Sequence, residues 1–75
     1  MGALPVATGS QVVRALQRAG YVLSHVRGSH HYLRKPGATH LVVVPVHGNR
    51  DLPKGTLRSV LRQAGLSPDE LAALL

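Results

Sequence analysis

Hydrophobic residues recur along the chain at two different spacings, which predict helices and strands in turn. After the capping sequence Thr8-Gly9-Ser10, apolar positions three and four residues apart predict a helix over residues 11–19. Residues 21–26 and 30–35 are rich in β-branched and aromatic side chains. Because Arg27-Gly28-Ser29 separates these two runs, they are expected to form the strands of a hairpin.

The second half of the chain predicts one strand, a loop and two helices. Residues 41–44 give the strongest strand signal, and Pro45 indicates that this strand ends there or lies at a sheet edge. Residues 46–54 are rich in Gly, Asn, Pro and charge and should form a surface loop. An apolar stripe predicts a helix over residues 56–64, and a capping box with proline at its first helical position predicts a short helix over residues 68–75.

The order α-β-β-β-α predicts an α+β fold, in which helices cover one face of a three-stranded antiparallel sheet and the other face is open. We expect a single domain over residues 1–75, with its core in residues 10–66 and a short C-terminal helix over residues 68–75. A domain of this size buries only roughly 60% of the surface that its unfolded form exposes, which leaves little room for a deep pocket. This favours chemistry on an exposed surface, where a polymer such as RNA can bind.

The composition narrows the partner and the compartment. Nine Lys and Arg against three Asp and Glu give a formal net charge of +6, which favours nucleic acid as partner over an acidic protein or an anionic lipid. The chain has no cysteine, which excludes a disulfide scaffold, a Cys-ligated zinc site and a thiol nucleophile. No apolar run approaches the ~20 residues of a membrane span, and the first residues lack the pattern of a signal peptide. We therefore expect a soluble, cytoplasmic protein without a membrane partner.

Two adjacent histidines, His30 and His31, are the candidates for chemistry. Side chains alternate between the faces of a strand, so if Leu33 faces the helices, His31 shares that covered side. The open face then carries His30 together with Tyr32 and Arg34. RNA is cut without a cofactor when a general base takes the proton of the 2′-hydroxyl, and imidazole exchanges protons close to neutral pH. This pattern favours His30 as the base and keeps His31 as the alternative.

A nearby cation would stabilise the negative charge that accumulates on the phosphate, and Arg34 or Lys35 could be this cation. Metal-dependent nucleases need clustered carboxylates. The only acidic residues here are Asp51, Asp69 and Glu70, of which the last two are expected at a helix start. A route through the 2′-hydroxyl is therefore favoured, with RNA and not DNA as substrate and with no metal or small-molecule cofactor.

Each candidate also has an interpretation that involves no function. The two histidines can simply begin a strand and bond to the backbone, and Gly28 can serve only a turn that needs a positive φ. Arg58 and Arg62 can be the solvated side of an amphipathic helix, although their field would still attract RNA. A zinc site is disfavoured, because the remaining histidines lack the spacing of a helical ligand pair. We expect surface or loop positions for His25, His40 and His47.

Three segments of the chain, taken together, match one family. They are residues 26–33 with Gly28-Ser29-His30-His31, residues 42–47, and the segment Asp51-Leu52-Pro53-Lys54-Gly55-Thr56-Leu57-Arg58-Ser59-Val60-Leu61. In this order and at these separations they resemble the HicA toxins, also called YcfA-like proteins, from about Ser10 to Leu66. The resemblance implies a double-stranded-RNA-binding-domain-like fold in a toxin that degrades messenger RNA. It also implies a HicB antitoxin that masks the active site.

The resemblance implies a catalytic residue as well. The catalytic histidine of the family follows a Gly-Ser pair, which corresponds to His30 here, with His31 as the alternative. The predicted function is that of a metal-independent mRNA endoribonuclease, the toxin of a type II toxin–antitoxin system. The alternatives are a non-catalytic RNA-binding module with the same fold and a basic protein-interaction subunit. The RNA-binding candidates are Gly28, Ser29, Tyr32, Arg34, Lys35, Lys54 and Arg58.

Overall fold

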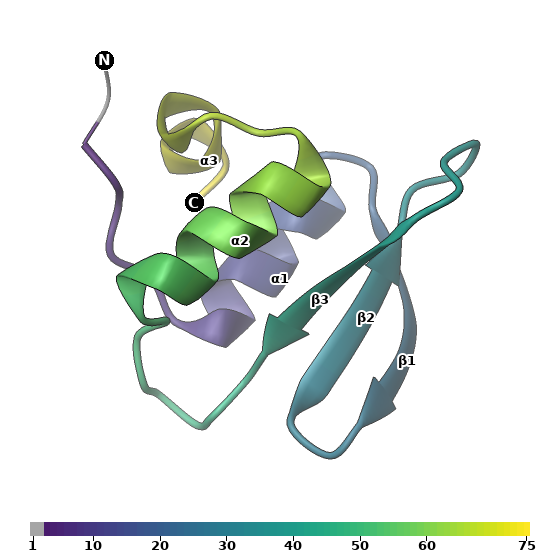
Figure 1. Ribbon diagram of the computed structural model, residues 1–75, viewed down its shortest axis with the longest axis horizontal. Coiled ribbons are helices and arrows are strands. Elements are labelled where there is room, and N and C mark those ends of the chain that lie inside the picture. Colours follow the sequence, from purple (N-terminus) through teal and green to yellow (C-terminus); the bar gives the residue numbers. More distant parts are fainter. Residues whose placement is uncertain (1–2) are drawn as a thin grey trace.

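The computed structural model describes residues 3–75 and follows the predicted order of elements (Figure 1). Along the chain lie α1 (Gly9–Arg18), β1 (Val22–Arg27), β2 (His30–Arg34), β3 (Leu41–Pro45), α2 (Lys54–Ala64) and α3 (Pro68–Leu74). Each boundary lies within two residues of its prediction. The α+β fold class, with a three-stranded antiparallel sheet and helices, is therefore confirmed.

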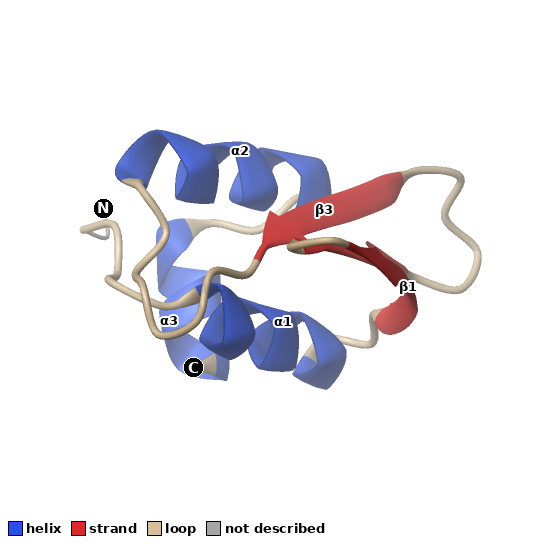
Figure 2. Cartoon of the chain, turned by 90° about the horizontal axis from the view of Figure 1, so that it is seen from below, coloured by secondary structure: helices blue, strands red, loops and turns tan. Residues whose placement is uncertain are grey.

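The sheet has the order β1-β2-β3, and both neighbouring pairs are antiparallel. α1 contacts all three strands and α2 contacts β3. Figure 2 shows the helices grouped at one side of the molecule and the strands at the other. β3 is an edge strand that ends at Pro45, so both expectations for this proline are confirmed. Proline lacks a backbone N–H, and at a sheet edge this position can face solvent, so no hydrogen bond between strands is lost.

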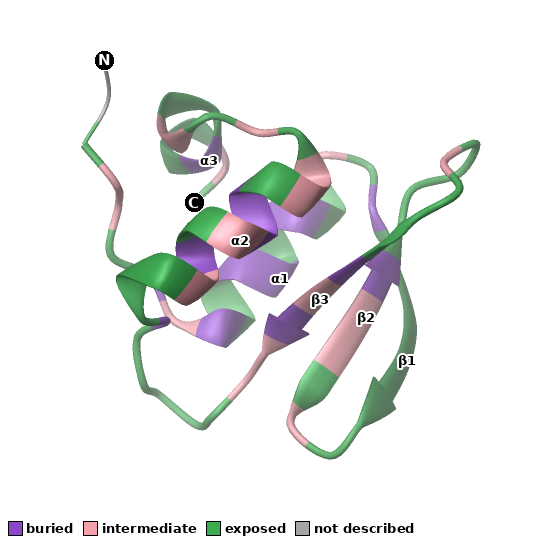
Figure 3. Ribbon diagram, viewed as in Figure 1, coloured by how far each residue is buried: buried purple, intermediate pink, exposed green. Residues whose placement is uncertain are grey.

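The core lies between the helices and the covered face of the sheet (Figure 3). Leu33 in the central strand is fully buried, and so are its neighbours on β3, Val42 and Val44. Among residues 3–75, no polar or charged side chain is buried. The described helices also include none with the length and apolar character needed to cross a membrane. The other buried apolar residues are Ala7, Val12, Val13, Ala15, Leu16, Tyr21, Leu52, Leu57, Val60, Leu61 and Leu71.

Local capping explains most helix boundaries. A capping box joins Thr8 and Gln11 at the start of α1, and a second one joins Ser67 and Glu70 at the start of α3. Such a cap contributes roughly 1 kcal/mol. The C-cap of α2 is Gly65, whose φ of 69° is left-handed.

α2 starts two residues earlier than the sequence predicts. Its N-cap is Pro53, whose carbonyl accepts the first helical hydrogen bond from the Leu57 N–H at 2.9 Å. Lys54 and Gly55 therefore belong to the helix. Glycine is a weak helix former and proline offers no side-chain cap, so the sequence pattern hid these two residues.

A β-bulge changes the side-chain alternation of β1. Leu23 pairs with Leu33 and His25 pairs with Tyr32, so Ser24 is an extra residue between two regular pairs. Paired residues of neighbouring strands point to the same face. The bulge therefore turns His25 to the open face.

Candidate active site

The open face of the sheet carries a cluster of polar and aromatic side chains from β1 and β2. On β2 they alternate with buried Leu33, which confirms the strand alternation expected from the sequence. On β1 the partner of His30 is Arg27, and the partner of Tyr32 is His25. We call this set the open-face cluster, and it consists of His25, Arg27, His30, Tyr32 and Arg34.

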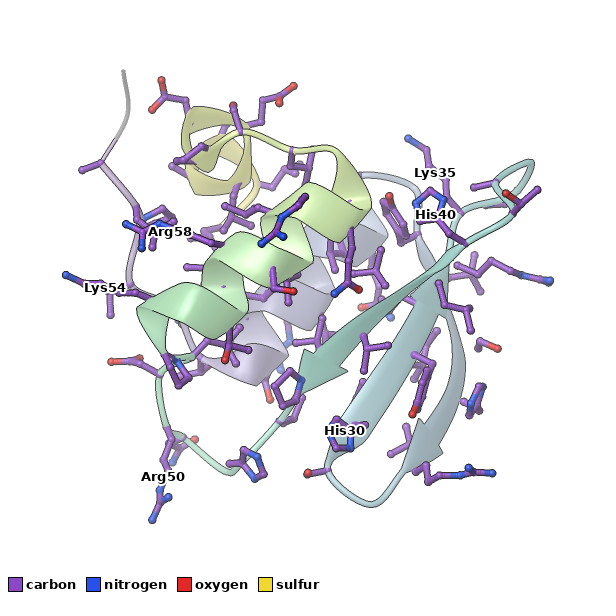
Figure 4. All side chains as sticks on the ribbon, in the orientation of Figure 1. His30, Lys35, His40, Arg50, Lys54 and Arg58 are labelled. Atoms are coloured by element: carbon purple, nitrogen blue, oxygen red, sulfur yellow. The ribbon has the colours of Figure 1, made fainter. Side chains whose placement is uncertain are left out.

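His30 is exposed and is held by the backbone on both sides. It is the first residue of the central strand, where it lies between Arg27 on β1 and Pro45 on β3. The turn before it contains Gly28 with a φ of 58°, and the Ser29 carbonyl accepts a 2.7 Å hydrogen bond from the Val46 N–H. Gly28 and Ser29 thus present His30 at the end of the hairpin (Figure 4).

His31 lies on the opposite side of β2. It is half-buried, and it lines a surface cavity of about 250 Å³ between α1 and the sheet, together with Arg14 and Gln17. Its Nδ1 is buried without a hydrogen-bond partner. The two adjacent histidines therefore cannot act on the same side of the sheet, and only His30 belongs to the open-face cluster.

His25 and Tyr32 form a stacked pair on the open face. Their ring centroids are 4.3 Å apart and the ring planes differ by 9°. A hydrogen bond of 3.1 Å joins the Ser24 Oγ and the His25 Nδ1. The exposed position of His25 agrees with the surface position expected from the sequence. Its place in the open-face cluster was not expected, because the bulge interrupts the side-chain alternation of β1.

The electrostatics of the cluster come from two arginines. Arg27 lies opposite His30, and Arg34 lies on the same face farther along β2. The acidic residues lie elsewhere, in the loop before α2 and on α3, at Asp51, Asp69 and Glu70. Arg27 was not among the predicted site residues, although a two-residue hairpin turn at Gly28-Ser29 is a signal that would have placed it opposite His30.

Of the predicted RNA-binding residues, Tyr32 and Arg34 belong to the cluster and Gly28 and Ser29 form the turn before it, whereas the other three lie elsewhere. The Lys35 Nζ is 5.7 Å from the centroid of the Tyr21 ring, and Lys54 and Arg58 belong to α2. Arg58 lines a different cavity, of about 380 Å³, with Leu61 and Arg62. Figure 4 shows Lys35 far from His30 along the sheet, and Lys54 and Arg58 along the helix.

The other histidines are dispersed. The His40 Nε2 lies 2.9 Å from the Gln63 carbonyl oxygen at the end of α2, and His47 is exposed in the loop after β3. In the described part of the chain, no group of three His, Asp or Glu side chains is arranged to hold a metal ion.

Comparison with known families identifies the chain. A family model described as the HicA toxin of bacterial toxin–antitoxin systems matches residues 9–66. A comparison with curated proteins gave no match. The matched segment begins with α1, contains the whole sheet and extends past the end of α2, so it includes every residue of the open-face cluster. The match covers well over half of the chain, and the chain therefore belongs to the HicA toxin family, the toxins of bacterial toxin–antitoxin systems.

Proposed function

We propose that this toxin is an mRNA endoribonuclease in which His30 acts as the general base. The observation that carries the proposal is the position of His30, exposed on an open sheet face directly opposite Arg27. A polymer can reach this imidazole without entering a pocket. The neighbouring guanidinium group can bind the phosphate next to the ribose whose hydroxyl is activated.

The reaction follows from this arrangement. The His30 imidazole takes the proton of a ribose 2′-hydroxyl, and the 2′-oxygen attacks the adjacent phosphorus. The bond from phosphorus to the 5′-oxygen breaks, the leaving oxygen takes a proton from water, and a 2′,3′-cyclic phosphate remains. General base catalysis of this kind typically contributes ~10²–10⁴-fold to the rate. Arg27, and Arg34 farther along β2, would stabilise the charge that builds up on the phosphate.

The distribution of carboxylates supports a route that uses no metal. A nuclease that holds magnesium needs several carboxylates around the scissile phosphate. In this chain Asp51 lies in the loop before α2, and Asp69 and Glu70 lie in the first turn of α3, so the acidic residues come from separate elements. Because the 2′-hydroxyl is the nucleophile, DNA would not be cut.

The proposal includes the partner and the place of action. Membership in a toxin family implies an antitoxin partner. A HicB-type antitoxin with an acidic surface would be complementary to the net charge of +6 and would block RNA by covering the open-face cluster. Messenger RNA as substrate places the activity in the cytoplasm.

The test is cleavage of a labelled transcript by the purified protein in the presence of EDTA. We expect fragments that end in 2′,3′-cyclic phosphate, and we expect His30→Ala to lower the cleavage rate by ~100-fold or more. His40→Ala is the matched control, because it removes an exposed histidine at the other end of the sheet and should leave the rate unchanged. Circular dichroism and the thermal midpoint of each variant would show that the fold is intact.

Four results would overturn the assignment. A requirement for magnesium would exclude the proposed route, and full activity of His30→Ala would remove its base. Loss of cleavage in a folded His31→Ala variant, with His30→Ala active, would move the role to the neighbouring histidine. RNA binding without cleavage would identify the chain as a binding module.

A further inference from the structure

The stacked rings of His25 and Tyr32 are built into the open face by an irregular strand. In a regular strand without a bulge, alternation would place His25 on the same face as Leu23, which lines the cavity on the helix side together with His31. The bulge instead brings the imidazole opposite Tyr32 on the face that also carries His30. β-Bulges often re-aim a side chain in this way next to functional sites.

The stack leaves one ring face available. Each ring covers one face of the other, and on its second side Tyr32 is paired with Val43 of β3. β1 is an edge strand, and within residues 3–75 no further strand lies beyond it. The outer face of the exposed His25 ring is therefore open to a planar ligand, and the hydrogen bond between the Ser24 Oγ and the His25 Nδ1 holds the ring in place.

We propose that the His25–Tyr32 pair is a nucleobase-stacking site, which holds an unpaired base of the RNA beside the ribose whose 2′-hydroxyl His30 deprotonates. The inference rests on the proposed nuclease function, because it specifies that the RNA bound at that same site is single-stranded. His30 and Tyr32 are two residues apart on β2, so by strand rise their Cα atoms lie about 7 Å apart. This separation is comparable to the length of a nucleotide.

Stacking selects single-stranded RNA. In a duplex both faces of each base are already covered by neighbouring base pairs, whereas an unpaired base can splay out onto an aromatic side chain. Every base has such a face, so the site would accept all four bases. It would distinguish single-stranded from double-stranded RNA. His25 and Tyr32 would therefore position the substrate, and the chemistry would remain with His30.

The alternative interpretation is that the two rings only stabilise the hairpin as a cross-strand pair. Aromatic and aliphatic substitutions distinguish a role in base stacking from a role in hairpin stability. Tyr32→Phe and His25→Phe keep a planar face, whereas Tyr32→Leu and His25→Leu keep an apolar side chain without one. If the role is purely structural, the leucine variants should have a lower thermal midpoint, and this decrease should be the same with and without RNA.

The experiment measures binding of 2′-O-methyl oligonucleotides, which offer no 2′-hydroxyl to activate. One oligonucleotide is single-stranded and carries the fluorescent base 2-aminopurine, and the other is its duplex form. We expect the folded protein to prefer the single strand and to quench the fluorescence. Each leucine variant should bind the single strand about 5- to 150-fold more weakly and lose the quenching, whereas the phenylalanine variants should retain both. His40→Leu is the matched control and should bind like the unchanged protein.

Cleavage of unmodified RNA is followed in parallel, so that the two proposals can fail separately. If the protein cuts RNA but folded leucine variants bind, quench and cut as before, the stacking site is refuted and the nuclease stands. Tighter binding of the duplex than of the single strand would also refute it. If binding and quenching follow the predicted pattern but no RNA is cut, the stacking site stands and the nuclease is wrong. If the protein binds no RNA, both proposals are wrong.

Discussion

The close approach of α1 to the end of β3 gives a sharp prediction for Gly9. This glycine is the first residue of α1 and is buried. An added Cβ would overlap the Pro45 carbonyl oxygen and would lie 3.0 Å from the Val46 Cα and 3.1 Å from the Val46 Cγ2. Two of these three atoms belong to the backbone, and pairing with β2 fixes the end of β3. Gly9→Ala can therefore be accommodated only by moving the helix or the strand.

The size of the effect follows from two opposing terms. Alanine favours a helix over glycine by up to about 1 kcal/mol, and overpacking a rigid contact costs up to about 3 kcal/mol. We expect Gly9→Ala to lower the free energy of unfolding by about 2 kcal/mol. For a chain of this length that corresponds to a thermal midpoint lower by roughly 10 °C. Urea and thermal denaturation followed by circular dichroism would measure both quantities.

Gly55→Ala is the matched control for this prediction. Gly55 also lies in the first turn of a helix, and an added Cβ there meets no atom within 4 Å. The same substitution should therefore raise the free energy of unfolding by up to about 1 kcal/mol. A Gly9→Ala variant as stable as the original chain, or shifts of the same sign at both positions, would refute the argument from close contact.

Two further predictions concern the core and the charge of the sheet. Leu33→Ala removes a fully buried side chain from the central strand and should lower the free energy of unfolding by about 2–5 kcal/mol, and an unchanged urea midpoint would contradict this. Arg27→Ala should weaken binding of single-stranded RNA for all sequences and reduce the slope of log K against log salt by about 0.7, the effect of one lost phosphate contact. Arg18→Ala, which removes a cation bonded to the Leu74 carbonyl at the far end of the chain, should leave that slope unchanged, and an equal reduction would refute the role of Arg27.

The elements could be predicted from the sequence because their signals are local. The capping box at Ser67 and Glu70 and the glycine at position 65 mark helix ends without reference to the rest of the fold. The side on which His30 lies could also be predicted, since β2 has no irregularity and Leu33 marks its buried face. One apolar residue was enough to orient a regular strand.

Alternation along β2 predicted only the part of the cluster that lies on that strand, because the rest depends on contacts between strands. The position of His25 is set by the bulge at Ser24, and nothing in the local sequence pattern marks that extra residue. Arg27 faces His30 only through hairpin pairing. Conversely, Lys35 follows Arg34 in sequence, but its ammonium group lies over the Tyr21 ring. Sequence neighbours were thus a poor guide to neighbours on the face.

Side-chain alternation along β2 places the residues proposed for RNA cleavage and the residue that stabilises the core on opposite faces of the sheet. Leu33 faces the core, and the residues on either side of it, Tyr32 and Arg34, face away from it. Side chains of the open-face cluster can therefore be exchanged without opening a cavity in the core, so that loss of cleavage in His30→Ala would report on chemistry and not on unfolding. For the same reason a partner that covers the open face can block the toxin without unfolding it. The proposed masking by an antitoxin would therefore leave the core intact.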